Sequence, residues 1–231
     1  RRTGHDAMER LELEAARRSD VTVVTSRSEV EMLRTRGIAD AAVVSLAETI
    51  TGGPASWEDR HGILFLGNYA HAPNVDAALR LAGEIMPRVR QSVPDITLTL
   101  AGADPTRAVR RLSSAFVSVP GFVDDLEPVF NRHRVFGAPL QFGAGLKGKI
   151  VRAMAAGIPI VTSGVGAEGI ATSENELVVA DDAASFAEAL VTLHENKGDW
   201  GIYSERVRQA ALDFAPETVA AQFYAVLEPA G

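Results

Sequence analysis

The chain has 231 residues, of which 46% are hydrophobic and 23% charged, and its formal net charge is −7. This length suits one large α/β domain, or one domain with a piece of another. The negative charge argues against a nucleic-acid-binding surface. Cysteine is absent and the five histidines are scattered, so we expect neither a disulfide framework nor a metal site.

The chain ends and the apolar runs bear on its cellular context. No apolar run approaches the ~20 residues of a transmembrane helix. The start has neither Met nor the apolar core of a signal peptide. We therefore expect a fragment or trimmed chain of a cytoplasmic protein. If that protein contacts a membrane peripherally, we expect the missing part to make the contact.

The first elements expected along the chain are a helix over residues 5–18, a strand over 21–25, a helix to about Arg36 and a strand over 41–45. Ser26 and Glu29 have the spacing of a capping box for the second helix. A polar, turn-rich segment follows at 51–56 and is the best candidate for a linker. These features divide the chain into residues 1–50, a linker over 51–60 and a domain over 61–231.

From residue 61 onward, short apolar strands alternate with helices. Strands are expected at 63–66, 96–101, 116–119, 134–138, 158–162 and 176–180. Asn74 is the expected cap of a helix over 75–90, and Asp124 is the expected cap of a helix that runs through Phe130. Pro105 is expected to start a further helix between them. Helices over 182–196, 199–213 and 216–227 close the chain. This alternation predicts a Rossmann-like, doubly wound parallel sheet of the α/β class.

Glycine follows five of the expected strands, at Gly67, Gly102, Gly121, Gly143 and Gly164. In parallel sheets, ligands bind at the carboxyl ends of the strands. A tight turn is a sufficient explanation for any one of these glycines. The whole set, together with nearby lysines, favours a ligand-binding edge.

The most informative stretch is the glycine-rich loop 143–149, which carries Lys147 and Lys149 and opens a small-residue helix. Backbone N–H groups at glycines can approach an anion closely, and a helix N-terminus favours negative charge. Residues 128–167 contain no Asp or Glu, and they include Arg132, Arg134, Lys147, Lys149 and Arg152. A diphosphate site would explain this window, although chance and burial remain an alternative.

Other phosphate and catalytic motifs fit less well. Loop 143–149 matches the front of a Walker A sequence, but Ile150 stands where that motif needs Ser or Thr for Mg²⁺. No Gly-x-Gly-x-x-Gly follows the first strand, which argues against a nicotinamide cofactor. No Gly-x-Ser-x-Gly elbow supports hydrolase chemistry.

Several segments taken together resemble the C-terminal, donor-binding half of a GT-B glycosyltransferase of family 4, also called group 1. The segments are residues 62–68, 73–77, 121–126, 138–140, the loop 143–149, residues 153–161 and residues 166–169. The resemblance covers about residues 60–230. Residues 1–50 resemble the last part of the N-terminal, acceptor-binding half, most of which is absent.

The resemblance implies retaining transfer of a sugar from a nucleotide-sugar donor to a glycan or lipid-linked acceptor, without an essential metal or cofactor. Lys147 or Lys149 would then contact the donor diphosphate. The segment Gly121, Phe122 and Val123 would hold the nucleobase. Gly67 and Asn68 lie where the family often has a phosphate-binding arginine, and Gly143, Gly145 and Glu168 would flank the donor. His71 and Asn74 could also face the cleft, although a helix cap explains Asn74 equally well. Because the acceptor half is missing, we expect no turnover by this chain alone.

Two positions depart from the family's pair of glutamates. Arg152 stands where the second glutamate accepts hydrogen bonds from the ribose, and Ala144 stands where the first faces the sugar. An arginine cannot accept a hydrogen bond. Arg152 would form either a structural ion pair or a third positive contact to the phosphates. Two alternatives therefore stay open: a non-catalytic GT-B-like module of a larger glycan-assembly protein, and a different nucleotide- or phosphate-binding Rossmann protein.

Overall fold

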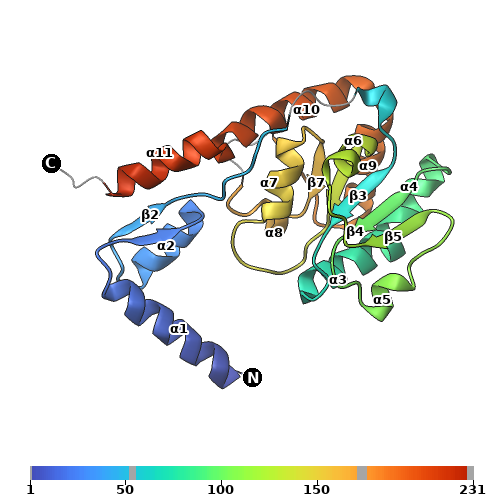
Figure 1. The fold of residues 1–231 in the computed structure, drawn as a ribbon. Coiled ribbons are helices and arrows are strands. Elements are labelled where there is room, and N and C mark those ends of the chain that lie inside the picture. The colour runs from blue at the N-terminus through green and yellow to red at the C-terminus, as the bar shows by residue number, and fades with distance from the viewer. Residues whose placement is uncertain (1, 52–55, 171–175, 228–231) are drawn as a thin grey trace.

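The structure is a computed structural model, and it describes residues 2–51, 56–170 and 176–227 (Figure 1). Its strands form a small two-stranded sheet and a six-stranded sheet, and every pairing between strands is parallel. The strands are β1 (Thr22–Val24), β2 (Ala41–Val43), β3 (Ile63–Leu66), β4 (Leu98–Ala101), β5 (Val117–Gly121), β6 (Val135–Ala138), β7 (Ile160–Thr162) and β8 (Val178–Val179).

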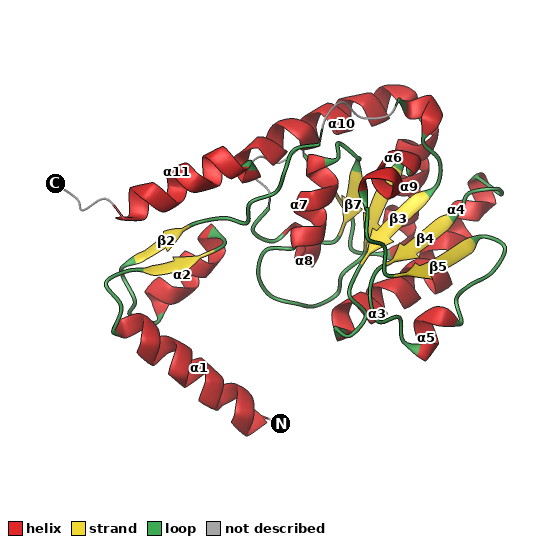
Figure 2. Cartoon of the chain, viewed as in Figure 1, coloured by secondary structure: helices red, strands yellow, loops and turns green. Residues whose placement is uncertain are grey.

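The six-stranded sheet has the order β5-β4-β3-β6-β7-β8 and is flanked by helices, as Figure 2 shows. The α-helices are α1 (Arg2–Arg17), α2 (Arg27–Thr35), α3 (Ala72–Arg80), α4 (Met86–Ser92), α5 (Arg107–Arg110), α6 (Glu127–Arg132), α7 (Gly148–Ala155), α8 (Gly164–Ala167), α9 (Ala183–Glu195), α10 (Lys197–Ala211) and α11 (Pro216–Leu227). The predicted Rossmann-like parallel sheet is therefore confirmed.

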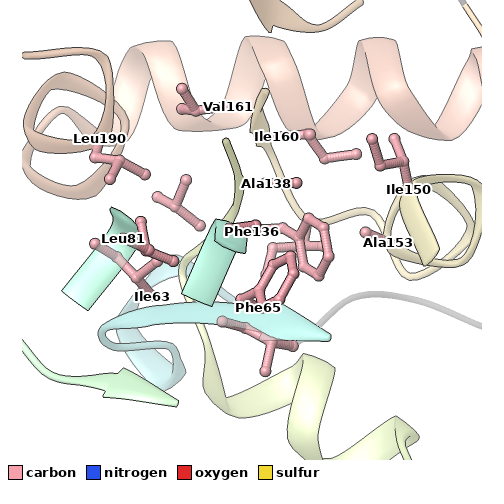
Figure 3. Packing of buried hydrophobic residues seen from close by; sticks show 14 of the residues in the cluster. Ile63, Phe65, Leu81, Phe136, Ala138, Ile150, Ala153, Ile160, Val161 and Leu190 are labelled. Atoms are coloured by element: carbon pink, nitrogen blue, oxygen red, sulfur yellow. The ribbon is translucent and has the colours of Figure 1, made fainter. Parts of the chain in front are cut away.

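The hydrophobic core lies between the central strands and the helices on either side of them. In Figure 3, Leu81 and Leu190 lie on one side of Phe136, and Ile150 and Ala153 of α7 lie on the other. All five side chains are fully buried. Burial of the central strands β3, β6 and β7 on both faces explains why their sequences are continuous apolar runs rather than alternating ones.

The helix after β3 differs from its predicted form. It begins at Ala72 with His71 as N-cap, so the prediction of Asn74 as its cap is wrong. Between α3 and α4 the chain forms a π-helical segment, Leu81–Ile85, in which the N–H of Met86 donates to the carbonyl of Leu81. Pro87 follows directly and has no N–H, so an ordinary α-helical ladder cannot continue through it.

Helix α6 starts later than predicted, whereas α3 starts earlier. Its N-cap is Leu126 rather than Asp124, and the prediction for Asp124 is therefore wrong. The neighbouring Asp125 accepts a hydrogen bond at Oδ1 from the N–H of Glu127, at 3.0 Å. Two consecutive aspartates offered the same local signal, and the sequence did not distinguish between them.

The first part of the chain has the predicted helix–strand–helix–strand order. Ser26 caps α2, and its side chain accepts from the N–H of Glu29. The N–H of Ser45 donates to Gln222 Oε1 of α11 at 3.0 Å, so α11 returns to the small sheet (Figure 1). Residues 52–55 of the predicted linker lie outside the described residues, and the division at 51–60 stays a prediction.

The segment before β3 is fastened to the amino end of the large sheet. Arg60 is completely buried and donates to the carbonyl of Phe130 at 2.9 Å. Arg134 lies over the ring of Trp57, with 3.7 Å between Cζ and the centroid, and donates to the carbonyl of His194. Arg134 directly precedes β6, whereas loop 143–149 follows the carboxyl end of that strand. The basic window of the sequence is therefore split between two ends of the sheet.

Candidate functional site

The carboxyl ends of the strands lie at one edge of the sheet, because all the strands are parallel. Five glycines occupy this edge: Gly67 after β3, Gly102 after β4, Gly121 at the end of β5, Gly143 in the loop after β6 and Gly164 after β7. The topology thus brings together the loops that the sequence marked for ligand binding.

Lys147 lies at the N-cap of α7 with only 9% of its surface exposed. Its ammonium donates to the carbonyl of Gly145 and lies 3.7 Å from Glu168 Oε2. Burial lowers the pKa of Lys147, while the carboxylates of Glu168 and Glu29 oppose that effect. Glu29 belongs to α2, so the small N-terminal part of the chain contributes a charge to this edge.

Lys149 lies two residues further along, inside the first turn of α7. Its ammonium donates to Asn74 Oδ1 and lies 5.1 Å from the centre of the Phe65 ring. Burial, together with the positive charge of Lys147, lowers the pKa of Lys149 to about 8. Two buried ammonium groups beside a helix N-terminus form a site where a bound anion would stabilise the charged form of both lysines.

Gly67 and Asn68 form the turn after β3. Asn68 is exposed, and its Oδ1 accepts from the N–H of Ala70 at 2.9 Å. Its backbone carbonyl accepts from Asn74 Nδ2 at 2.7 Å. A Cβ atom at Gly67 would come within 2.9 Å of Asn74 Cβ. The turn therefore accommodates Asn74, which in turn contacts Lys149.

The predicted nucleobase segment follows β5 at the same edge. Phe122 is 71% exposed, whereas Val123 is partly buried against the core. The carbonyl of Gly121 accepts from the N–H of Gly102 at 2.8 Å, which fixes the turn against its neighbour. An exposed aromatic ring on a fixed turn offers a flat apolar surface at this edge.

The ion-pair partner of Arg152 differs from the partners of the two lysines. Arg152 Nε is 3.6 Å from Glu48 Oε1, and half of the arginine side chain is exposed. Arg152 and Glu48 line a hollow of about 240 Å³ together with Asp124, Asp125 and Glu127. The structural ion pair expected as one possibility for Arg152 is present. Ala144 is exposed in the loop before α7.

Glu168 follows the short helix α8. Ser163 caps that helix by accepting from the N–H of Gly166, and Asp181 Oδ1 accepts from the N–H of Gly164 at 2.9 Å. These two bonds fix the start of the short helix that ends beside Glu168, whose carboxylate lies 3.7 Å from Lys147. No cluster of three or more His, Asp or Glu suited to a metal ion occurs within the described ranges, and no helix there could span a membrane.

Sequence reasoning gave an incomplete account of two groups of this site. Asn74 was interpreted as a helix cap that could also face the cleft, and its contact with Lys149, 75 positions away in the chain, was not predicted. Glu29 was interpreted only as part of a capping box. Its N–H does donate to Ser26 Oγ at 3.3 Å, but its Oε2 accepts from the N–H of Thr25 and the hydroxyl of Ser26 rather than from the N–H of Ser26. In both cases a local signal accounted for the residue, and only the fold showed its second neighbour.

Comparisons with known proteins place the chain in a family. The family model for group 1 glycosyl transferases matches residues 60–196. A Klebsiella pneumoniae protein described as an uncharacterized 44.6 kDa protein in the cps region is 28% identical over 144 residues. That match covers 58% of this chain and 37% of the Klebsiella protein.

Solved structures share the fold at low identity. A point mutant of S. aureus TarM, in complex with fondaparinux, α-GlcNAc-glycerol and UDP, superposes with a TM-score of 0.80 at 12% identity. The match covers 95% of this chain and 46% of TarM. Anabaena Alr3699/HepE in complex with UDP-glucose gives 0.76 at 15% identity, over 94% of this chain and 66% of HepE. The chain thus spans less than half the length of the Klebsiella protein and of TarM. Since the family match covers more than half of its residues, the chain belongs to the group 1 glycosyltransferases.

Proposed function

We propose that this chain binds the diphosphate of a nucleotide-sugar donor and forms the donor half of a retaining glycosyltransferase. The observation that carries the proposal is the pair Lys147 and Lys149 at the start of α7, at the carboxyl edge of the sheet, both with lowered pKa values. Perturbed titratable groups gathered in one place are typical of functional sites. Family membership and the UDP and UDP-glucose complexes of TarM and HepE support the same assignment.

The two lysines and the helix N-terminus have a clear electrostatic task in such a reaction. The bond between the sugar and the diphosphate breaks, and negative charge develops on the departing phosphate oxygen. Fixed positive groups that already lie at this point stabilise the transition state more than the ground state. We assign this task to Lys147 and Lys149, with neither metal nor cofactor. In the free protein, Glu168 partly neutralises Lys147.

The remaining parts of the donor follow from the arrangement of the loops. Gly121, Phe122 and Val123 would hold the nucleobase, with the exposed Phe122 ring available for stacking. Gly143 and Gly145 would flank the phosphates or sugar. The acceptor, a glycan or a lipid-linked sugar, would bind mainly to a part of the protein that this chain does not contain. The chain alone would therefore not turn over.

A second candidate function is a non-catalytic donor-binding module. It is favoured by Arg152, which is paired with Glu48 where the family resemblance implies a ribose-binding carboxylate. Turnover distinguishes the two candidates. If the protein that contains this chain together with its acceptor half transfers sugar, and a Lys149→Ala change abolishes the transfer, the non-catalytic module is excluded.

Binding of the donor's leaving group is tested by titration calorimetry with UDP, GDP, ADP and the matching nucleosides. We expect one or more diphosphates to bind and the nucleosides to bind far more weakly. Lys149→Ala should weaken diphosphate binding about tenfold or more, the scale of one charge-assisted hydrogen bond. The effect should be larger at low salt.

Lys197→Ala is the matched control, because this exposed lysine pairs with Glu58 of the segment preceding β3. Its affinity for the diphosphate should equal that of the unaltered chain. Absence of binding by every diphosphate at millimolar concentration would contradict the proposal. So would an equal loss of affinity in the Lys149 and Lys197 variants.

A further inference from the structure

Asn74 is a polar side chain buried in the first turn of α3, with 7% of its surface exposed. It does not cap the helix, because His71 is the N-cap. Both ends of its amide are hydrogen-bonded: Oδ1 accepts from the Lys149 ammonium, and Nδ2 donates to the carbonyl of Asn68 at 2.7 Å. A lysine ammonium can only donate and a carbonyl can only accept, so these partners fix the orientation of the amide.

The turns after β3 and β4 are shaped around this side chain. A Cβ at Gly67 would lie 2.9 Å from Asn74 Cβ and 3.0 Å from Asn74 Cγ. Gly102 has a φ of +134°, and a Cβ there would lie 1.9 Å from the carbonyl oxygen of Gly67. Glycine at both positions therefore allows the β4 turn to pack against the β3 turn, which packs against Asn74.

The chemistry of an amide suits this position. Lys149 is buried and lies near a second lysine, and both effects disfavour its charge. The face of the Phe65 ring attracts the ammonium but carries no countercharge. A carboxylate at position 74 would hold the ammonium but would also cancel its charge. The amide oxygen holds it and leaves the positive charge available to an anion. Because the amide is bonded at its other end to the backbone after β3, it ties a flexible lysine to the rigid sheet.

We propose that Asn74 is a positioning residue for the donor diphosphate, which it serves by fixing the ammonium of Lys149 at the carboxyl edge of the sheet. This inference rests on the proposed function. It also gives Gly67, which was expected to be among the donor-binding residues, an indirect role: Gly67 provides the space that Asn74 occupies. A change at Asn74 should therefore alter diphosphate affinity only when Lys149 is present.

A double-mutant cycle tests this dependence. The affinity of the best-binding nucleoside diphosphate and of inorganic pyrophosphate is measured for the unaltered chain, Asn74→Ala, Lys149→Ala and the double variant. We expect Asn74→Ala to weaken both ligands about fivefold, on the scale of one lost hydrogen bond. The double variant should bind no more weakly than Lys149→Ala. Equal losses on both backgrounds, or no loss in Asn74→Ala, would overturn the inference.

Two further variants separate positioning from folding. Asn74→Asp keeps the shape of the side chain but neutralises Lys149, and we expect it to bind diphosphate more weakly than Asn74→Ala. Asn196→Ala removes an asparagine that caps α10 by accepting from Gly198 and Asp199, so it should lower the melting temperature without changing the affinity. If Asn196→Ala weakened binding as much as Asn74→Ala, a purely structural role for Asn74 would explain both results.

The outcomes distinguish this inference from the proposed function. If the unaltered chain binds no diphosphate and no pyrophosphate, the proposed function fails and the role of Asn74 fails with it. If the unaltered chain binds and Lys149→Ala binds more weakly, but Asn74→Ala binds as tightly as the unaltered chain, only the inference about Asn74 is wrong.

Discussion

Lys149 is a cation held where its charge is poorly compensated. The Asn74 amide accepts one hydrogen bond from it, the Phe65 ring lies beneath it, and Lys147 repels it. Burial and the repulsion from Lys147 make this side chain lose its proton more easily than a solvated lysine does. An anion that binds here restores the charged form, so binding and protonation are linked.

This linkage predicts a pH dependence of diphosphate affinity. The pKa of Lys149 in the free protein is about 8, so the fraction that carries a proton falls as the pH rises through that value. The phosphates are largely ionised above neutral pH. We expect affinity to fall about tenfold between pH 7 and pH 9, as for a single lysine with this pKa. The lowered pKa of Lys147 acts in the same direction.

Lys149→Arg is the control for the pH series, because a guanidinium stays charged throughout this range. Its affinity should vary much less with pH, whatever its absolute value. An unaltered chain whose affinity is constant from pH 7 to pH 9 would show that Lys149 either is not in the site or titrates normally. Calorimetry in buffers of different ionisation enthalpy would measure the proton uptake directly.

The sequence predicted the role of a single residue well where the local pattern indicated only one kind of site. Loop 143–149 identified Lys147 and Lys149 because glycines, lysines and a following helix stand together. The same window was misleading for Arg134, which belongs to the opposite end of the sheet. Two residues that are close in sequence lie at the same end of the sheet only when no strand separates them.

The turns after β3 and β4 are the elements on which the site is built. They pack so closely that Gly102 has no room for a Cβ, and its φ of +134° also disfavours any other residue. We expect Gly102→Ala to destabilise the protein by more than about 2 kcal/mol, because both the clash and the backbone strain must be relieved. Chemical denaturation with a circular-dichroism readout measures this difference.

Gly83→Ala is the matched control, because Gly83 lies in the π-helical segment with no atom within 4 Å of an added Cβ. Alanine is favoured over glycine in helices by about 1 kcal/mol, so this change should be neutral or stabilising. If Gly102→Ala lowered the free energy of unfolding no more than Gly83→Ala does, the two turns could not be packed as closely as described.

Most elements could be predicted from the sequence, because apolar runs and turn residues alternate clearly along it. Their starts were less predictable: Asn74 and Asp124 were expected to be caps, whereas His71 and Leu126 occupy those positions. Several polar residues near a helix start can serve as its cap, and the local pattern alone does not decide between them. The π-helical segment before Pro87 was not anticipated, because a proline alone does not reveal how the helix passes it.

At the scale of the whole molecule, the parallel sheet followed from the alternation of strands and helices, but the strand order did not. The order β5-β4-β3-β6-β7-β8 places β3 beside β6, a pairing of segments far apart in the sequence. This pairing positions loop 143–149 next to the turn that carries Asn68, and it explains why Lys149 meets Asn74. The contribution of Glu29 likewise depends on how α2 lies beside loop 143–149, where a Cβ at Gly145 would be 3.6 Å from Glu29 Oε1.

The measurement that tests the donor-site assignment most directly is a crystal structure of this chain soaked with UDP and, separately, with GDP. We predict a diphosphate at the N-terminus of α7, within hydrogen-bonding distance of Lys149, and a base beside residues 121–123. A nucleotide bound instead along α10, in the large surface groove that includes Ile202 and Arg206, with loop 143–149 left free, would contradict this assignment.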